Sequence, residues 1–151
     1  MSTGRDLSDR ITHRAITPGD LEFLYRVYAS TRQEELSVLD WGDKEREAFL
    51  RMQFDAQHTY YMDQFPDAAF DLILLEGEPI GRLYLDPRKD EVRIIDIALL
   101  PAYRRQGIGS HLMAEIMDEA GARGLRVRIH VERNNPAMRL YHRLGFRKIG
   151  D

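Results

Sequence analysis

A short glycine-bearing segment in the second half of the chain joins a strand-like run to a helical pattern. The apolar run from Arg93 to Leu100 ends just before the segment Arg104 to Gly109, and helical spacing begins near Ser110. A helix leaves its first backbone N–H groups without partners and carries partial positive charge at that end. Glycines remove the side chains that would keep a ligand away from these groups. The segment therefore predicts a phosphate-binding loop that opens a helix.

A second patterned stretch follows this helix. A strand-like run from Leu125 to Val131 leads into a turn that contains Asn134 and Asn135, and then into a short helical pattern that carries Tyr141. The pattern closes on Leu144-Gly145-Phe146. A strand, an asparagine turn and a short helix in this order form a second candidate ligand-contacting region.

The two regions together resemble the signatures of the GNAT superfamily of acyl-CoA-dependent N-acetyltransferases. Arg104, Gly107 and Gly109 fill the pyrophosphate-loop pattern of that family without a gap. The stretch from Val131 to Phe146 reproduces the second signature, and the resemblance covers roughly residues 91–150. It implies an acetyltransferase that uses acetyl-CoA, the acetylated form of coenzyme A, as cosubstrate.

The periodicity of the whole chain agrees with such a fold. Strands are expected over residues 10–16, 69–75, 80–85, 93–100 and 125–131, and helices over 21–30, over 43–57 and from 110 onward. We therefore predict an α/β (α+β) domain with a GNAT-like mixed, mainly antiparallel sheet flanked by helices on both faces, and a splayed strand pair at the cofactor site. A single domain over residues 1–151 is expected, with residues 1–10 flexible.

Charge is distributed unevenly along the chain. Residues 1–87 hold 9 Lys and Arg against 17 Asp and Glu, a net charge of −8, whereas residues 88–151 hold 13 against 8, a net charge of +5. A basic half suits a cosubstrate that carries several phosphates, and an acidic half suits a cationic amine. The acidic half also argues against nucleic-acid binding.

Cysteine is absent from the sequence, which excludes disulfides, thiol nucleophiles and cysteine-ligated zinc. The longest apolar runs have the length of strands, and the polar N-terminus lacks the apolar core of a signal peptide. We expect a cytoplasmic protein that needs no metal and does not associate with a membrane.

The resemblance also implies which residues hold the cosubstrate. The loop backbone would bind the pyrophosphate, and backbone groups of the preceding strand would pair with the pantetheine arm as an added strand does. An amide side chain from the turn would bond the pantetheine amides, although counting from Val131 selects Asn135 and counting from Tyr141 selects Asn134. The expected contact residues are Ile97, Ala98, Leu99, Arg104, Arg105, Gln106, Gly107, Ile108, Gly109, Ser110, Asn134 and Asn135.

Candidate catalytic residues follow from the same alignment of motifs. Tyr141 matches the family tyrosine, whose hydroxyl protonates or hydrogen-bonds the departing thiolate. The place of the family's glutamate base is taken by Arg93, which cannot accept a proton. Asp96, which period-two alternation puts on the opposite face from Arg93, and His130 on the neighbouring strand remain as alternative bases.

The acceptor is expected to be a primary amine of a small molecule or a protein. By resemblance, the helical region before residue 65 supplies acceptor contacts. The aromatic stretch His58 to Phe65 either lines this pocket or packs on the sheet, and packing is favoured. A non-catalytic acyl-CoA-binding module is the main alternative function. An unrelated nucleotide-binding protein lacks support, because no Walker lysine follows the glycines.

The C-terminus departs from the family pattern. Family members finish with two strands after the Gly-Phe pair, whereas residues 146–149 supply one strand at most. Either the C-terminal strands are incomplete because the chain is truncated, or a partner chain covers the open sheet edge in a homodimer.

Overall fold

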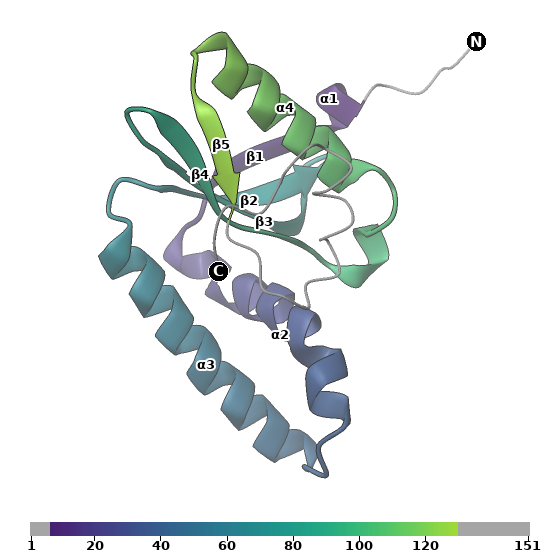
Figure 1. The fold of residues 1–151 in the computed structure, drawn as a ribbon. Helices are drawn as coiled ribbons and strands as arrows, with labels where there is room; N and C mark the ends of the chain where they lie inside the picture. The colour runs from purple at the N-terminus through teal and green to yellow at the C-terminus, as the bar shows by residue number, and fades with distance from the viewer. Residues whose placement is uncertain (1–6, 130–151) are drawn as a thin grey trace, which may run out of the picture.

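The computed structural model describes residues 7–129, which form one mixed sheet covered by helices (Figure 1). Two short 3-10 turns, Pro18–Asp20 and Pro101–Tyr103, precede a helix and the glycine loop respectively. In chain order the remaining elements are α1 (Leu7–Arg10), β1 (Ile11–Ala15), α2 (Leu21–Ser37), α3 (Asp43–Gln64), β2 (Ala69–Leu75), β3 (Glu78–Pro87), β4 (Glu91–Leu99), α4 (Ile108–Ala122) and β5 (Arg126–Ile129).

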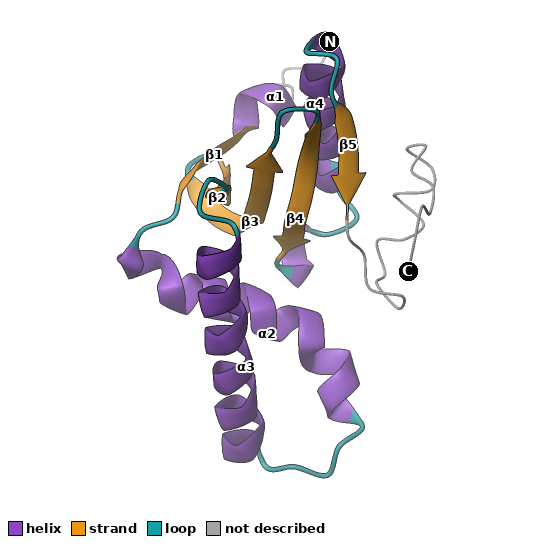
Figure 2. Ribbon diagram, turned by 60° about the vertical axis from the view of Figure 1, so that its left-hand side comes forward, coloured by secondary structure: helices purple, strands orange, loops and turns teal. Residues whose placement is uncertain are grey.

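The sheet has the order β1-β2-β3-β4-β5. The first four strands are antiparallel, and β4 pairs with β5 in parallel, since α4 forms the crossover between them. Figure 1 shows α4 over one face of the sheet, with α2 and α3 against the other. Figure 2 shows α2 and α3 continuing beyond the ends of the strands. The expectation of a mixed, mainly antiparallel sheet with helices on both faces is confirmed.

Two apolar clusters lie on opposite faces of the sheet. The cluster under α4 contains Ile94 from β4 and Ile108 and Met113 from the helix, all of which are buried. The cluster under α2 and α3 contains Leu24, Phe54 and other large side chains. Strands that carry apolar residues on both faces are therefore enclosed on both sides, which fixes their register.

Helix α3 is two turns longer than the sequence pattern predicts. It continues to Gln64 and includes the aromatic stretch that follows Gln57. The reason is tertiary packing: the ring of Tyr61 meets Tyr84 of β3 edge-on at 5.9 Å and Phe65 at 6.3 Å between ring centroids. The expected packing of this stretch on the sheet holds for Tyr61, whereas Tyr60 is 56% exposed.

The N-terminal stretch expected to be flexible contains α1. Its Leu7 packs against the cluster under α4, so this part of the stretch is tied to the core. None of the helices within residues 7–129 is long and apolar enough to cross a membrane.

An ion pair closes the turn between β1 and α2. Arg14 donates two hydrogen bonds to Asp20, at 2.8 and 3.0 Å, and the backbone N–H of Thr17 donates a third to the same carboxylate at 2.8 Å. The Arg14 guanidinium is the main cause that holds the pKa of Asp20 well below its usual range. Because the pKa is lower in the folded state, Asp20 stabilises the fold above the pKa of an unfolded aspartate and loses this contribution in acid.

We therefore expect Asp20→Asn to lower the free energy of unfolding at pH 7 and to flatten its decline in acid. The difference between Asp20→Asn and the wild type should stay constant above about pH 5 and shrink below about pH 4, where unfolded aspartate takes up a proton. Urea unfolding between pH 3 and pH 7 measures this difference. A constant difference across the whole range would contradict the role given to this carboxylate.

Candidate active site

The loop before α4 has an unusual backbone. Arg105 has a φ of 61° and Gly107, the residue that caps the helix, a φ of 81°. Both values lie in the left-handed region, which glycine enters without strain and other residues rarely enter. Ile108 then turns inward and is 2% exposed, which anchors the first turn of α4 in the core. A glycine at the end of the loop permits this backbone, and the apolar residue after it anchors the loop to the core.

The N–H groups of this loop are available to a ligand. The first backbone bond of the helix runs from the N–H of His111 to the carbonyl of Gly107 at 3.0 Å. Within the described part of the chain, the preceding N–H groups at 105–110 have no backbone acceptor. A Cβ added to Gly107 would have no heavy atom within 4 Å, so the space beside the loop is open. N–H groups without backbone acceptors at the start of a helix suit a phosphate.

Arg104 fixes the loop through side-chain hydrogen bonds. Its Nε donates to the carbonyl oxygen of Leu99 at 2.9 Å, and its Nη2 donates to Oγ of Ser30 in α2 at 3.3 Å. Gln106 adds a bond from Nε2 to the carbonyl oxygen of Ala102 at 2.7 Å. The first position of the glycine signature therefore connects the loop, the end of β4 and α2 to one another.

The strand that leads to the loop contains a β-bulge. Leu85 lies opposite Ile94 and Tyr84 lies opposite Asp96, so Ile95 is an extra residue on β4. A bulge bends the strand and disturbs the alternation of its side chains. The prediction that Asp96 lies on the opposite face from Arg93 is wrong for this reason. Both now belong to the face covered by α2 and α3.

Beyond the bulge, Ile97, Ala98 and Leu99 form the last part of β4. The described pairing between β4 and β5 ends at Ile94 and Ile129, and Figure 2 shows β4 continuing past the arrowhead of β5. The side chains of Ile97 and Leu99 pack under α4. The Leu99 carbonyl already accepts the bond from Arg104. Splaying of the two strands beyond this point stays a prediction, because the continuation of β5 lies outside the described residues.

Of the three candidate catalytic residues, Asp96 is the one that lies within the described residues. Its Oδ2 accepts a hydrogen bond from Nε of Arg82 at 2.6 Å, and Nη2 of the same arginine also contacts it. The Asp96 side chain is 25% exposed, whereas that of Arg82 is 4% exposed. Tyr141, His130 and both turn asparagines, Asn134 and Asn135, lie outside the described residues.

Sequence reasoning missed the residues that surround Asp96. Arg82 interrupts the apolar run of β3, and its Nη2 donates to Oε1 of Gln57 in α3 at 2.9 Å. Burial lowers the pKa of Arg82, but the combined effect of Asp96, Tyr84 and Tyr61 outweighs burial and raises it. A charged residue in an otherwise apolar strand was the available signal, because a buried arginine requires a partner.

Two further titratable groups lie on this face. Burial, followed by the positive charge of Arg82, lowers the pKa of His58 in α3. Burial also raises the pKa of Tyr84, which is fully enclosed, and its hydroxyl has no hydrogen-bond partner among the described residues. A lowered histidine pKa favours the neutral imidazole near pH 7. The site is therefore denser in ionisable groups than the sequence motifs indicate.

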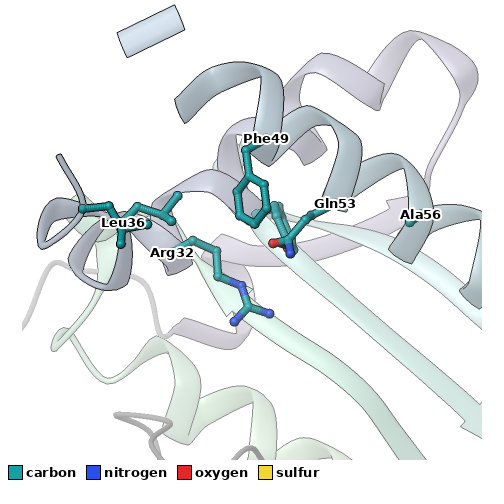
Figure 3. Close-up of a pocket in the computed structure, with 7 residues that line it drawn as sticks. Arg32, Leu36, Phe49, Gln53 and Ala56 are labelled. Carbon is teal, nitrogen blue, oxygen red and sulfur yellow. Dashed lines mark hydrogen bonds between the residues drawn. The ribbon is translucent and has the colours of Figure 1, made fainter. Parts of the chain in front are cut away.

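A cavity of about 560 Å³ lies between α2 and α3. Figure 3 shows Phe49 and Gln53 projecting from α3 toward Arg32 of α2. The guanidinium of Arg32 lies 5.3 Å from the ring centroid of Tyr28. No acidic side chain belongs to the described lining, which consists of Tyr28, Arg32, Leu36, Leu39, Phe49, Gln53 and Ala56. The lining combines apolar side chains with polar ones from both helices, and its surface is more polar than apolar.

In residues 7–129, no three or more histidine, aspartate or glutamate side chains lie close enough to hold a metal ion. The charged side chains of the described site instead pair with one another.

Comparison with known proteins agrees with this geometry. The model of the acetyltransferase (GNAT) family matches residues 25–146, which is most of the chain. An uncharacterized protein of Mycobacterium leprae is 37% identical over 60 residues. That match spans 40% of this chain but 16% of the relative, which is a much longer protein.

Solved structures show the same fold. The PaiA N-acetyltransferase of Thermoplasma acidophilum, solved in complex with coenzyme A, has a TM-score of 0.65 at 20% identity over 91% of this chain and 89% of its own. The ribosomal-protein-S18-alanine N-acetyltransferase of Escherichia coli has a TM-score of 0.62 at 22% identity over 93% of this chain and 79% of its own. With a family model that spans both the glycine loop and the asparagine turn, the chain belongs to the GNAT acetyltransferase family.

Proposed function

We propose that this protein is an N-acetyltransferase that moves an acetyl group from acetyl-CoA to a primary amine. The observation that carries the proposal is the set of N–H groups at the head of α4 that have no backbone acceptor within residues 7–129, beside the open space at Gly107. A basic C-terminal half and the family's acetyltransferase character support the same conclusion. The relative solved with coenzyme A supports a cosubstrate of this type.

The loop at 105–110 would hold the pyrophosphate through its backbone, and Arg104 would keep the loop in shape. Backbone groups near Ile97 and Ala98, which follow the bulge, would hold the pantetheine arm. When bound, acetyl-CoA supplies an acetyl group activated as a thioester. An N–H of the bulged strand aimed at the thioester oxygen would stabilise the charge that develops there during transfer.

The proposed reaction also requires a base and a proton donor. The acceptor ammonium must lose a proton before its nitrogen can attack, and the departing thiolate must gain one. Asp96 is one candidate base, since its Oδ1 accepts no hydrogen bond from the described residues while Oδ2 is fixed by Arg82. His130 is the alternative base, and Tyr141 is the proposed proton donor to the thiolate.

The acceptor would enter through the cavity between α2 and α3. Among the described residues, its lining includes one arginine and one glutamine and no carboxylate. Asp43, which belongs to the acidic N-terminal half, is fully exposed on α3. An amine that carries both polar and apolar groups is therefore the substrate type that this cavity suits best.

A thiol-release assay tests the function. Purified protein is incubated with acetyl-CoA and a panel of amines that includes polyamines, amino acids and peptides with a free N-terminus. We expect thiol release with at least one amine. In Tyr141→Phe we expect kcat to fall by about a hundredfold while the Kd for coenzyme A stays within twofold, because the phenol acts only on the leaving group.

Two results would change this conclusion. Tight binding of acetyl-CoA without turnover of any amine would favour the acyl-CoA-binding module. Absence of heat on titration with coenzyme A would remove the cosubstrate assignment altogether.

A further inference from the structure

We infer that Arg82 and Gln57 are positioning residues that fix Asp96 and the β4 bulge, and so connect acceptor helix α3 to the strand that faces the thioester. This inference rests on the proposed acetyl transfer. It assigns roles to two side chains that belong to neither of the sequence signatures. Neither residue is required to touch a substrate.

The geometry of the connection is continuous. Gln57 Oε1 accepts from Nη2 of Arg82 at 2.9 Å, and Nε of Arg82 donates to Asp96 Oδ2 at 2.6 Å. Arg82 is 3% exposed, and its guanidinium carbon lies 5.0 Å from the centroid of the Tyr84 ring. A planar guanidinium held on three sides has one orientation, so it can orient the carboxylate that it contacts.

The position of Asp96 in β4 explains why its contact with Arg82 affects the residues that follow. Asp96 directly follows Ile95, the extra residue of the bulge, and directly precedes Ile97, where the proposed cosubstrate contacts begin. A bulge interrupts the ladder and leaves the strand freer to bend at that point. The side-chain contact from β3 replaces the lost backbone constraint and sets the direction of the following residues.

Stability alone does not account for such a pair. The cost of burying two charges is comparable to their attraction, so a buried ion pair often adds little to the free energy of unfolding. What it does provide is a defined geometry. Here the hydrogen-bonded side chains connect the cavity helix to β4. Gln57 comes one helical turn after Gln53, which lines the cavity.

The test compares Gln57→Leu and Arg82→Lys with two matched controls. Arg51→Lys alters an arginine that also forms a bidentate ion pair, with Glu22, and also stacks on a tyrosine ring, but lies on the outer surface. Gln64→Leu alters an exposed glutamine at the end of the same helix. We expect kcat to fall at least about tenfold in the two test variants, while their KM for acetyl-CoA stays within twofold of the wild type. In both controls we expect kcat to stay within twofold of the wild type.

A conservative variant separates positioning from general packing. Gln57→Glu keeps an oxygen that can accept from Arg82, and we expect it to recover kcat to within about threefold of the wild type. Wild-type kcat in Gln57→Leu, or no recovery in Gln57→Glu, would overturn the inference. A fall in unfolding free energy with unchanged kcat would show that the pair serves stability only.

Amide hydrogen exchange gives a readout that does not depend on activity. In the folded Gln57→Leu and Arg82→Lys variants we expect faster exchange in the peptide over residues 93–99, and unchanged exchange over 108–122. Unchanged exchange over 93–99 would overturn the inference even if the wild type acetylates no amine. Absence of thiol release by the wild type would instead refute the proposed function, so the two failures are distinguishable.

Discussion

Replacement of Gly81 by alanine is expected to lower the free energy of unfolding by about 2–3 kcal/mol. A Cβ at this position would lie 2.2 Å from the carbonyl oxygen of Ala98 and 3.1 Å from Cα of Leu99. The atoms that it meets are mainly backbone, so no side-chain rotation relieves the contact. Strand β4 must move away from β3, and it must do so at the segment proposed to hold the pantetheine arm.

Urea unfolding of Gly81→Ala measures the loss in stability, and a steady-state assay at a temperature where the variant is folded measures the loss in turnover. Gly121→Ala is the matched control. Gly121 lies within α4, and an added Cβ there meets nothing within 4 Å. Because alanine is the better helix former, we expect this control to be neutral or more stable by up to about 1 kcal/mol. Equal stabilities of the two variants would show that β3 and β4 are not held as closely as described.

Replacement of Gly107 by valine is expected to weaken coenzyme A binding by at least about tenfold. Gly107 has a φ of 81°, and a β-branched residue there strains the backbone that points its N–H groups outward. An added side chain would also occupy the open space beside the loop. Both effects act on the same row of N–H groups, so the loss should appear in the Kd measured by calorimetry.

Gly77→Val separates strain from binding. Gly77 has a φ of 88° in the turn between β2 and β3, and it too has open space around its Cβ position. Each substitution should therefore lower the free energy of unfolding by about 1–2 kcal/mol. Only Gly107→Val should change the Kd for coenzyme A. Equal Kd values in the two variants would refute the assignment of the pyrophosphate to this loop.

The sequence was most informative where local patterns decide the structure. Strand β2 was predicted with its observed bounds, because an apolar run between clear turn signals leaves little choice. The glycine loop was also predicted at the head of the long helix, since the change from strand to helical spacing marks its position. Motif order was sufficient to predict the family and the mixed sheet.

Features that depend on contacts between distant segments were not predictable in this way. The β4 bulge arises from the register of β3 against β4. Its one extra residue places Asp96 on the same face as Arg93, whereas strict alternation predicts the opposite face. The last two turns of α3 depend on Tyr61 meeting Tyr84, a residue 23 positions away in the chain. The hydrogen bond from Arg82 to Gln57 likewise joins residues 25 positions apart. Single-sequence periodicity carries no information on such pairings.

The contacts of Arg104 have a consequence for how the binding of two ligands is coupled. Its guanidinium contacts Leu99 at the end of β4 and Ser30 on α2, so it connects the anion-binding loop to a helix that also lines the cavity. If an amine bound in the cavity shifts α2, the anion-binding loop must shift with it. Thermodynamic reciprocity then requires that whatever the amine does to coenzyme A affinity, coenzyme A does equally to amine affinity.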